Sequence, residues 1–291
     1  MRAATPTSAT SSRTARPGRP ESAGASTPRR SSSAPRRAAV QVTAIADPLV
    51  AALLLIPAGF VAGALNTVAG GGSFLTLPLL ILLGLPHTAA NGTNRLAILI
   101  QSAGATAAFR RADVMPVGVL VRLGLAAILG AGLGSTLAVH VGETVFLRFL
   151  SIVMVLFTLF PLLHVDAPTR AGPPRTGIGL LAAFVVVGFY GGFLQAGVGF
   201  LSLGATSWAG YGLVAGNAIK VACIFLFSIV SLSVFAANGA VDWGIGLALG
   251  IGTFAGALLG ARLTLKAGDR ILRFIVAAAT LAFAVALWLR T

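Results

Sequence analysis

The chain has 291 residues, of which 56% are hydrophobic and 10% are charged, and its formal net charge is +14. A soluble domain carries about 25% charged residues, so this composition excludes an ordinary soluble protein. Apolar runs of about 20 residues recur from residue 48 onward without the alternation of barrel strands, and the predicted fold class is therefore an all-α integral membrane protein.

The first 45 residues form a compositionally separate segment. Eight arginines against one acid, Glu21, place +7 of the net charge here. The segment is rich in Ser, Thr, Ala and Pro and has no apolar period, so we predict a disordered Arg/Ser-rich tail over 1–45. It has the bias of a transit peptide, although a solvated cytoplasmic tail or sequence upstream of the true start codon is the simpler explanation. Basic residues between 29 and 37 predict a cytoplasmic tail, and the lack of aromatics and binding motifs argues against nucleic acid as a partner.

Ten apolar segments follow in chain order. The long ones cover about 48–69, 89–109, 115–139, 144–164, 177–198, 214–237, 242–264 and 270–289. Two short runs, 74–86 and 200–211, have a length more typical of re-entrant or half-helices than of full spans. We therefore predict about eight long spans and two short helices. The stretch HVDAPTRAGPPRT, residues 164–176, is the one internal segment with the character of a linker.

The segments on either side of this linker resemble each other at an offset of 125 to 129 residues. The matched positions are Gly59, Gly63, Gly84, Asn91, Gly130 and Gly134 with Gly188, Gly192, Gly210, Asn217, Gly256 and Gly260. We predict two homologous helical halves, with a first membrane repeat over 46–165, a linker over 166–176 and a second repeat over 177–291. Re-entrant short runs give parallel halves and crossing ones give inverted halves; the distribution of arginines favours eight crossings and parallel halves.

Each half contains a glycine-rich break at membrane depth. The first is Gly70-Gly71-Gly72 before Ser73, and the second contains Gly197 and Gly199. Glycine lets the backbone leave the helical path, and in lipid such a break must face protein or a water-filled cavity. A half-helix that begins near Ser73 would aim unpaired N–H groups at an anion. Close helix packing is the alternative explanation, and it is the preferred one for Gly130, Gly134, Gly256 and Gly260.

The second candidate feature is a cation that follows an asparagine after each short run. The first half has Asn91, Thr93, Asn94 and Arg95, and the second has Asn217 and Lys220. A cation inside a span by default marks a site or a pathway, and two cations without nearby acids suit an anionic substrate. Snorkelling of each side chain to the headgroups is the alternative.

Two buried amides in the segments before the breaks, Asn66 and Gln195, would add hydrogen bonds to an anion or would only join neighbouring helices. The predicted spans are nearly free of acids, so we expect no catalytic residue, no metal, no cofactor and no enzyme; a membrane-embedded enzyme acting on a small or lipidic substrate is the alternative. The chain has no P-loop.

These motifs resemble the sulfite exporter TauE/SafE family of membrane permeases. The resemblance covers about 48–289 and rests on the GGG break, Ala-Asn-Gly-Thr-Asn-Arg-Leu at 90–96 and the GALLGAR run at 256–262. It implies a secondary transporter for sulfite, organosulfonates or related small anions in the bacterial inner membrane, with the lipid bilayer and the anion as partners. The oligomeric state stays open, a homo-oligomer included. Ala69 and Gly197-Val198-Gly199 depart from the family's pattern, so we expect the second break to be less open than the first.

Overall fold

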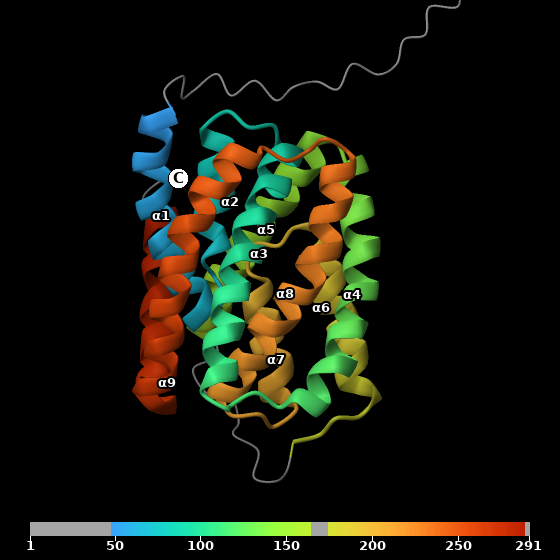
Figure 1. Cartoon of the computed structure of the whole chain (residues 1–291), viewed down its shortest axis with the longest axis vertical. Helices are drawn as coiled ribbons and strands as arrows, with labels where there is room; N and C mark the ends of the chain where they lie inside the picture. The colour runs from blue at the N-terminus through green and yellow to red at the C-terminus, as the bar shows by residue number, and fades with distance from the viewer. Residues whose placement is uncertain (1–47, 164–173, 289–291) are drawn as a thin grey trace, which may run out of the picture. The chain divides into compact units, whose positions relative to one another are not determined.

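The structure is a computed structural model that describes residues 48–163 and 174–288, and its regular structure in these ranges is helical (Figure 1). The helices are α1 (Pro48–Val68), α2 (Ser73–Leu82), α3 (His87–Arg111), α4 (Val117–His140), α5 (Glu143–Leu163), α6 (Ile178–Phe193), α7 (Val198–Trp208), α8 (Leu213–Ala237) and α9 (Trp243–Trp288). The predicted tail over 1–45 and most of the predicted linker over 166–176 lie outside the described residues.

The predicted segments match these helices, with two differences. Helix α9 is continuous from Trp243 to Trp288 and so takes in both predicted segments, 242–264 and 270–289. Helix α6 ends at Phe193 instead of near 198. The short runs are confirmed as short helices: α2 has 10 residues and α7 has 11. At a rise of about 1.5 Å per residue, each covers about half of a bilayer core.

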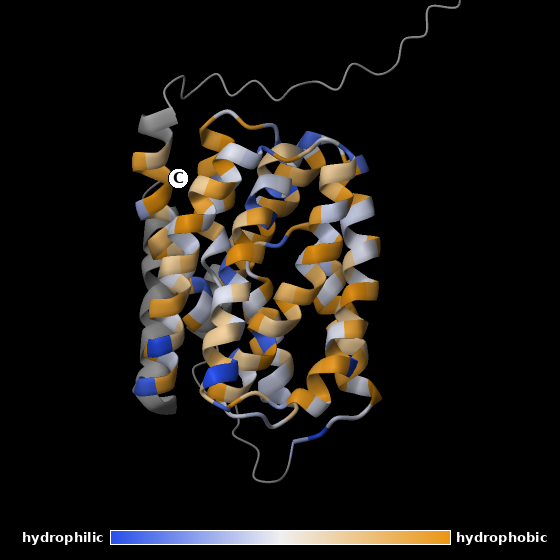
Figure 2. Cartoon of the chain, in the orientation of Figure 1, coloured by the Kyte–Doolittle hydropathy of each residue, from blue (hydrophilic) through white to orange (hydrophobic). Residues whose placement is uncertain are grey.

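The exposed surface of the helices is apolar in continuous stripes, which fits a lipid-facing exterior. On α4, Val121, Leu125, Leu129 and Leu133 recur every fourth residue and are each more than half exposed. Three helical stretches in the described part have the length and composition to cross a membrane: Val117–His140, Leu213–Ala237 and Trp243–Lys266. Figure 2 shows apolar residues along most of the length of the helices, with hydrophilic residues near helix ends and at a few places within the bundle.

Glycines allow two helix pairs to approach until backbone contacts backbone. Between α1 and α9, a Cβ at Gly256 would lie 1.9 Å from the Phe60 carbonyl oxygen. Between α4 and α6, a Cβ at Gly130 would lie 2.0 Å from the Val185 carbonyl oxygen. Small residues permit this kind of packing where lipid gives no hydrophobic drive for association. The predicted packing role of these glycines, and of Gly134 and Gly260 one turn further along, is confirmed.

The same contacts give the direction of each helix. Gly59 lies against Leu249 and Gly63 against Thr253, so α1 runs with α9. By the same reasoning α3 is parallel to α9, and α4 is parallel to both α6 and α8. The start of α3 lies at the end of α8, where the Arg95 guanidinium stands 4.6 Å from the centre of the Phe235 ring, so these two helices are antiparallel.

Helices that the sequence aligns therefore run in opposite directions: α1 against α6, α3 against α8, and α4 against the first part of α9. The expectation of parallel halves is wrong for these segments. Because α1 and α3 run in the same direction, α2 must return the chain between them, and α1 with α2 forms a helical hairpin (Figure 1). The same reasoning holds for α6, α7 and α8.

Candidate functional site

The first break has the predicted position. The backbone is irregular from Ala69 to Gly72, and α2 begins at Ser73, as expected. The Ala69 and Gly70 amides both donate to the Leu65 carbonyl at the end of α1, at 2.8 and 3.2 Å. Gly70 has a φ of 94°, in the left-handed region that side chains disfavour. The helix therefore ends where only a glycine turns the chain without strain.

The second break lies a few residues earlier than predicted. Its irregular residues are Leu194 to Gly197, and Gly199 is already inside α7. The backbone N–H of Gln195 donates to the Tyr190 carbonyl, and Gln195 has a φ of 68°. Gln195 thus occupies the position after α6 that Gly70 occupies after α1. Asn66 and Gln195 do not occupy equivalent places, because Asn66 lies inside the last turn of α1 whereas Gln195 lies beyond the end of α6.

Each break contacts the first turn of the short helix that follows the other. A Cβ at Gly199, in α7, would lie 2.3 Å from the Gly70 Cα, and a Cβ at Gly197 would lie 2.3 Å from the ring of Phe74, in α2. Next to this contact, the rings of Phe74 and Phe200 stack with their centroids 6.4 Å apart, and Phe157 of α5 lies 5.7 Å from Phe200. The meeting point is therefore filled in this conformation.

Arg95 binds the carboxyl end of α6, the helix that ends at the second break. Its Nη1 donates to the Gly191 carbonyl at 2.9 Å and to the Gln195 side-chain oxygen at 3.1 Å. Its Nη2 donates to the Gly192 carbonyl and to the Asn91 side-chain oxygen, the latter at 3.3 Å. The last four carbonyls of a helix have no partner within it. Four of the five guanidinium donors thus have protein acceptors, three of them at the end of α6 or just beyond it and the fourth on Asn91 of α3.

A network of amides and hydroxyls fixes the surroundings of Arg95. The Asn91 amide nitrogen donates to the Phe193 carbonyl at 2.8 Å. The Thr76 hydroxyl of α2 donates to the Asn94 side-chain oxygen at 2.7 Å. The Thr93 hydroxyl instead accepts from the Asp242 amide at 2.9 Å, so it ties α3 to the start of α9. Thr93 therefore serves a helix contact apart from the guanidinium.

Lys220 does for α1 what Arg95 does for α6. Its Nζ donates to the carbonyls of Asn66 at 3.0 Å and Thr67 at 2.8 Å, in the last turn of α1. A positive charge at the carboxyl end of a helix is also favoured by the helix dipole. Asn66 thus takes part through its backbone, whereas its side chain was the group predicted.

Both cations are fully buried, at 0% exposure. The snorkelling alternative is therefore wrong for Arg95 and Lys220, because neither head group reaches the surface. Among the acids whose side chains the structure describes, Asp113 and Glu143 are exposed and Asp242 is only partly buried. Within that part of the chain, the positive charges are held by carbonyl and amide oxygens and have no carboxylate partner.

Several buried polar atoms at these two centres have no hydrogen-bond partner. Around Arg95 they are the guanidinium Nε, the Gln195 amide nitrogen and the Asn94 amide nitrogen. Near Lys220 they are both side-chain atoms of Asn217 and the Ser202 hydroxyl. Buried polar groups without a partner are rare in proteins and call for an explanation. Every one of these atoms except the Asn217 oxygen can donate a hydrogen bond. This set of donors suits an anion.

The structure thus brings Arg95, Asn91 and Gln195 to the carboxyl end of α6 and Lys220 to the carboxyl end of α1. Sequence reasoning missed the carbonyl acceptors, the Phe235 ring, and the hydroxyls of Thr76 and Ser202. The hydroxyls stand at matched positions of the two short helices, at an offset of 126 residues, and this spacing was the signal that could have found them.

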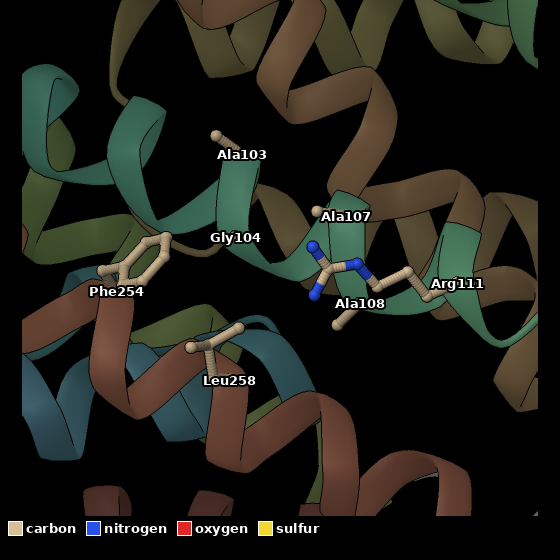
Figure 3. Close-up of a pocket in the computed structure, with 7 residues that line it drawn as sticks. All are labelled: Ala103, Gly104, Ala107, Ala108, Arg111, Phe254 and Leu258. Atoms are coloured by element: carbon tan, nitrogen blue, oxygen red, sulfur yellow. The ribbon is translucent and has the colours of Figure 1, made fainter.

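A separate pocket of about 310 Å³ lies between α3 and α9, toward the opposite end of α3 from Arg95. Small and apolar residues line it together with Arg111, as Figure 3 shows. None of the residues predicted from the sequence borders this pocket, so it is not the predicted site. In the described part of the chain, no group of three His, Cys, Asp or Glu side chains could hold a metal ion.

Comparison with known proteins gives consistent results. The family described as "Sulfite exporter TauE/SafE" matches residues 55–287. The chain is 30% identical over 239 residues to the probable membrane transporter protein ORF9 of a Sinorhizobium species, which covers 80% of this chain and 90% of that protein. It is 29% identical to a probable membrane transporter protein of Haemophilus influenzae, and the match covers 77% of this chain and 89% of that protein. It is 30% identical to the probable membrane transporter protein YfcA of Escherichia coli K12, and the match covers 78% of this chain and 85% of that protein. No solved structure matches significantly.

Proposed function

Since the chain belongs to the sulfite exporter TauE/SafE family of multi-pass membrane transporters, we propose that it is a secondary transporter for small anions such as sulfite, organosulfonates or related organic acids. The observation that carries the proposal is the pair of buried cations without a carboxylate partner, each next to a broken helix. A fixed positive charge that lacks a counter-ion inside a membrane attracts an anion, and each centre has donors left over to bind it.

We infer that the two helical hairpins, α1 with α2 and α6 with α7, are re-entrant, and this arrangement suggests how the path alternates. In this proposal the halves are inverted repeats, each with one hairpin whose tip meets the other at the contact between Gly70 and Gly199. Transporters of this kind bind substrate at the repeat interface near midplane, beside discontinuous helices. The filled contact then corresponds to a closed barrier, and its separation would open the path to an anion. The bacterial inner membrane and a cytoplasmic amino-terminal tail belong to the same proposal.

Reconstitution tests the proposed function. Purified protein is placed in lipid vesicles, and the uptake of labelled sulfite, methanesulfonate and acetate is measured against protein-free vesicles. We expect saturable uptake of at least one anion without ATP, because no P-loop is present in the sequence. Vesicles that accumulate none of the three anions under any imposed proton or sodium gradient would contradict a small-anion transporter of this class.

The amino-terminal segment is expected to be dispensable. A chain that begins at Ala46 should insert and transport at a rate within about twofold of the full chain, because the composition of residues 1–45 supports no packed core. The uptake assay per inserted protein checks this expectation. Correct insertion with complete loss of uptake would show that the tail takes part in transport.

A further inference from the structure

The two buried cation centres differ at matched positions. Thr76 and Ser202 occupy equivalent places on α2 and α7, and Asn91 and Asn217 do so on α3 and α8, both at an offset of 126 residues. Thr76 has a bond to Asn94, and both ends of the Asn91 amide are bonded. Ser202 and both ends of Asn217 have no partner. At these two matched pairs the side chains are therefore bonded beside Arg95 and unbonded beside Lys220. The unpartnered donors of the Arg95 centre, its Nε and the Gln195 and Asn94 amide nitrogens, lie at other positions.

The open groups lie close together. Residues 209–212 join α7 to α8, and so short a connection makes the two helices antiparallel neighbours. A Cβ at Gly216 would lie 2.8 Å from the Thr206 hydroxyl, which fixes their register. One turn further along each helix, Ser202 is level with Lys220. Asn217 is three residues before Lys220 and so lies on the same face of α8.

The chemistry of these groups selects the ligand. A lysine ammonium has three donors, and the described residues supply acceptors for two of them. Three donors beside one positive charge therefore have no acceptor among the described residues. They are the third Lys220 donor, the Asn217 amide nitrogen and the Ser202 hydroxyl. Each residue is at most 1% exposed, so bulk water does not satisfy these groups. The Asn217 oxygen adds one acceptor for a protonated oxygen of the ligand.

We propose that the centre formed by Lys220, Asn217 and Ser202 is the primary substrate site and takes a small singly charged oxoanion, whereas the Arg95 centre mainly holds the end of α6 in place. This assignment rests on the proposed function. It also gives α1 a part in binding, because the two α1 carbonyls fix the position of the Lys220 ammonium.

Matched hydroxyl deletions test the assignment. Ser202→Ala removes a group without a partner, so the melting temperature should be unchanged. The KM for sulfite or methanesulfonate uptake should rise at least about tenfold, since a hydrogen bond to a charged group contributes about 1.5–3 kcal/mol. Thr76→Ala removes the same hydroxyl at the matched position, where it has a protein partner. It should lower the melting temperature and change the KM less than twofold.

Asn217→Ala and Lys220→Gln complete the test. Asn217→Ala should raise the KM about tenfold with normal stability, and Lys220→Gln should raise it more. Unchanged KM in both Ser202→Ala and Asn217→Ala would overturn the assignment, as would an equal rise in Thr76→Ala. Failure of the proposed function looks different, because the unmodified protein would then accumulate none of the anions and no KM could be measured.

Discussion

Replacing Arg95 by Ala is expected to give the largest loss of stability of any single side-chain truncation at the two cation centres. The change leaves the Gly191 and Gly192 carbonyls and the Gln195 and Asn91 side-chain oxygens without a donor. An unsatisfied buried acceptor costs about 1–3 kcal/mol, so several together amount to a substantial part of the stability of a typical protein. Arg95→Lys should recover only part of the loss, because a point charge cannot reproduce a planar fork.

The measurement is the apparent melting temperature of purified protein in detergent, followed by the loss of the monodisperse peak. Arg110→Ala is the matched control, because Arg110 is exposed at the other end of the same helix. A cation there contributes about 0.3–1 kcal/mol through the helix dipole. Equal melting temperatures for Arg95→Ala and Arg110→Ala would contradict the helix-end role of Arg95.

Methyl groups at the meeting point of the two breaks are expected to abolish transport. In Gly199→Ala the new carbon would lie 2.3 Å from the Gly70 Cα, and in Gly70→Ala it would lie 2.5 Å from the Gly199 carbonyl carbon. Gly70→Ala also places a side chain at a φ of 94°. Such backbone strain costs about 1–3 kcal/mol, and overpacking adds about 1–3 kcal/mol. The hairpin tips must separate in either variant, so the barrier cannot close.

Gly204→Ala is the control for this experiment, because Gly204 is in α7 and a Cβ there meets nothing within 4 Å. It should be neutral or slightly stabilising, since alanine favours a helix over glycine by about 1 kcal/mol. Uptake into vesicles and the melting temperature are read together. Normal uptake by both Gly70→Ala and Gly199→Ala would show that the close contact of the breaks is not needed for transport.

The sequence by itself determined the membrane class and most helix boundaries. Apolar length defines a membrane helix locally, so α3, α4 and α8 begin and end within a few residues of the predicted limits. The start of α2 at Ser73 was also predictable, because a glycine triplet is a local interruption of the helix. The packing glycines were found for the same reason, since a small side chain at helical spacing marks a close approach in the sequence itself.

Only the tertiary structure decided what the buried cations do. The carbonyls that Arg95 and Lys220 bind lie 96 and 153 residues away, at Gly191 and Thr67. Every residue has a backbone carbonyl, so the residue type does not indicate which carbonyl accepts the hydrogen bond of a buried cation. The relative direction of the helices could not be predicted for a similar reason, because a short apolar run has the same composition whether it crosses the membrane or returns to the same side. Asn91 and Asn217 are the same residue at matched places, and whether each is bonded depends on the helix end that reaches it.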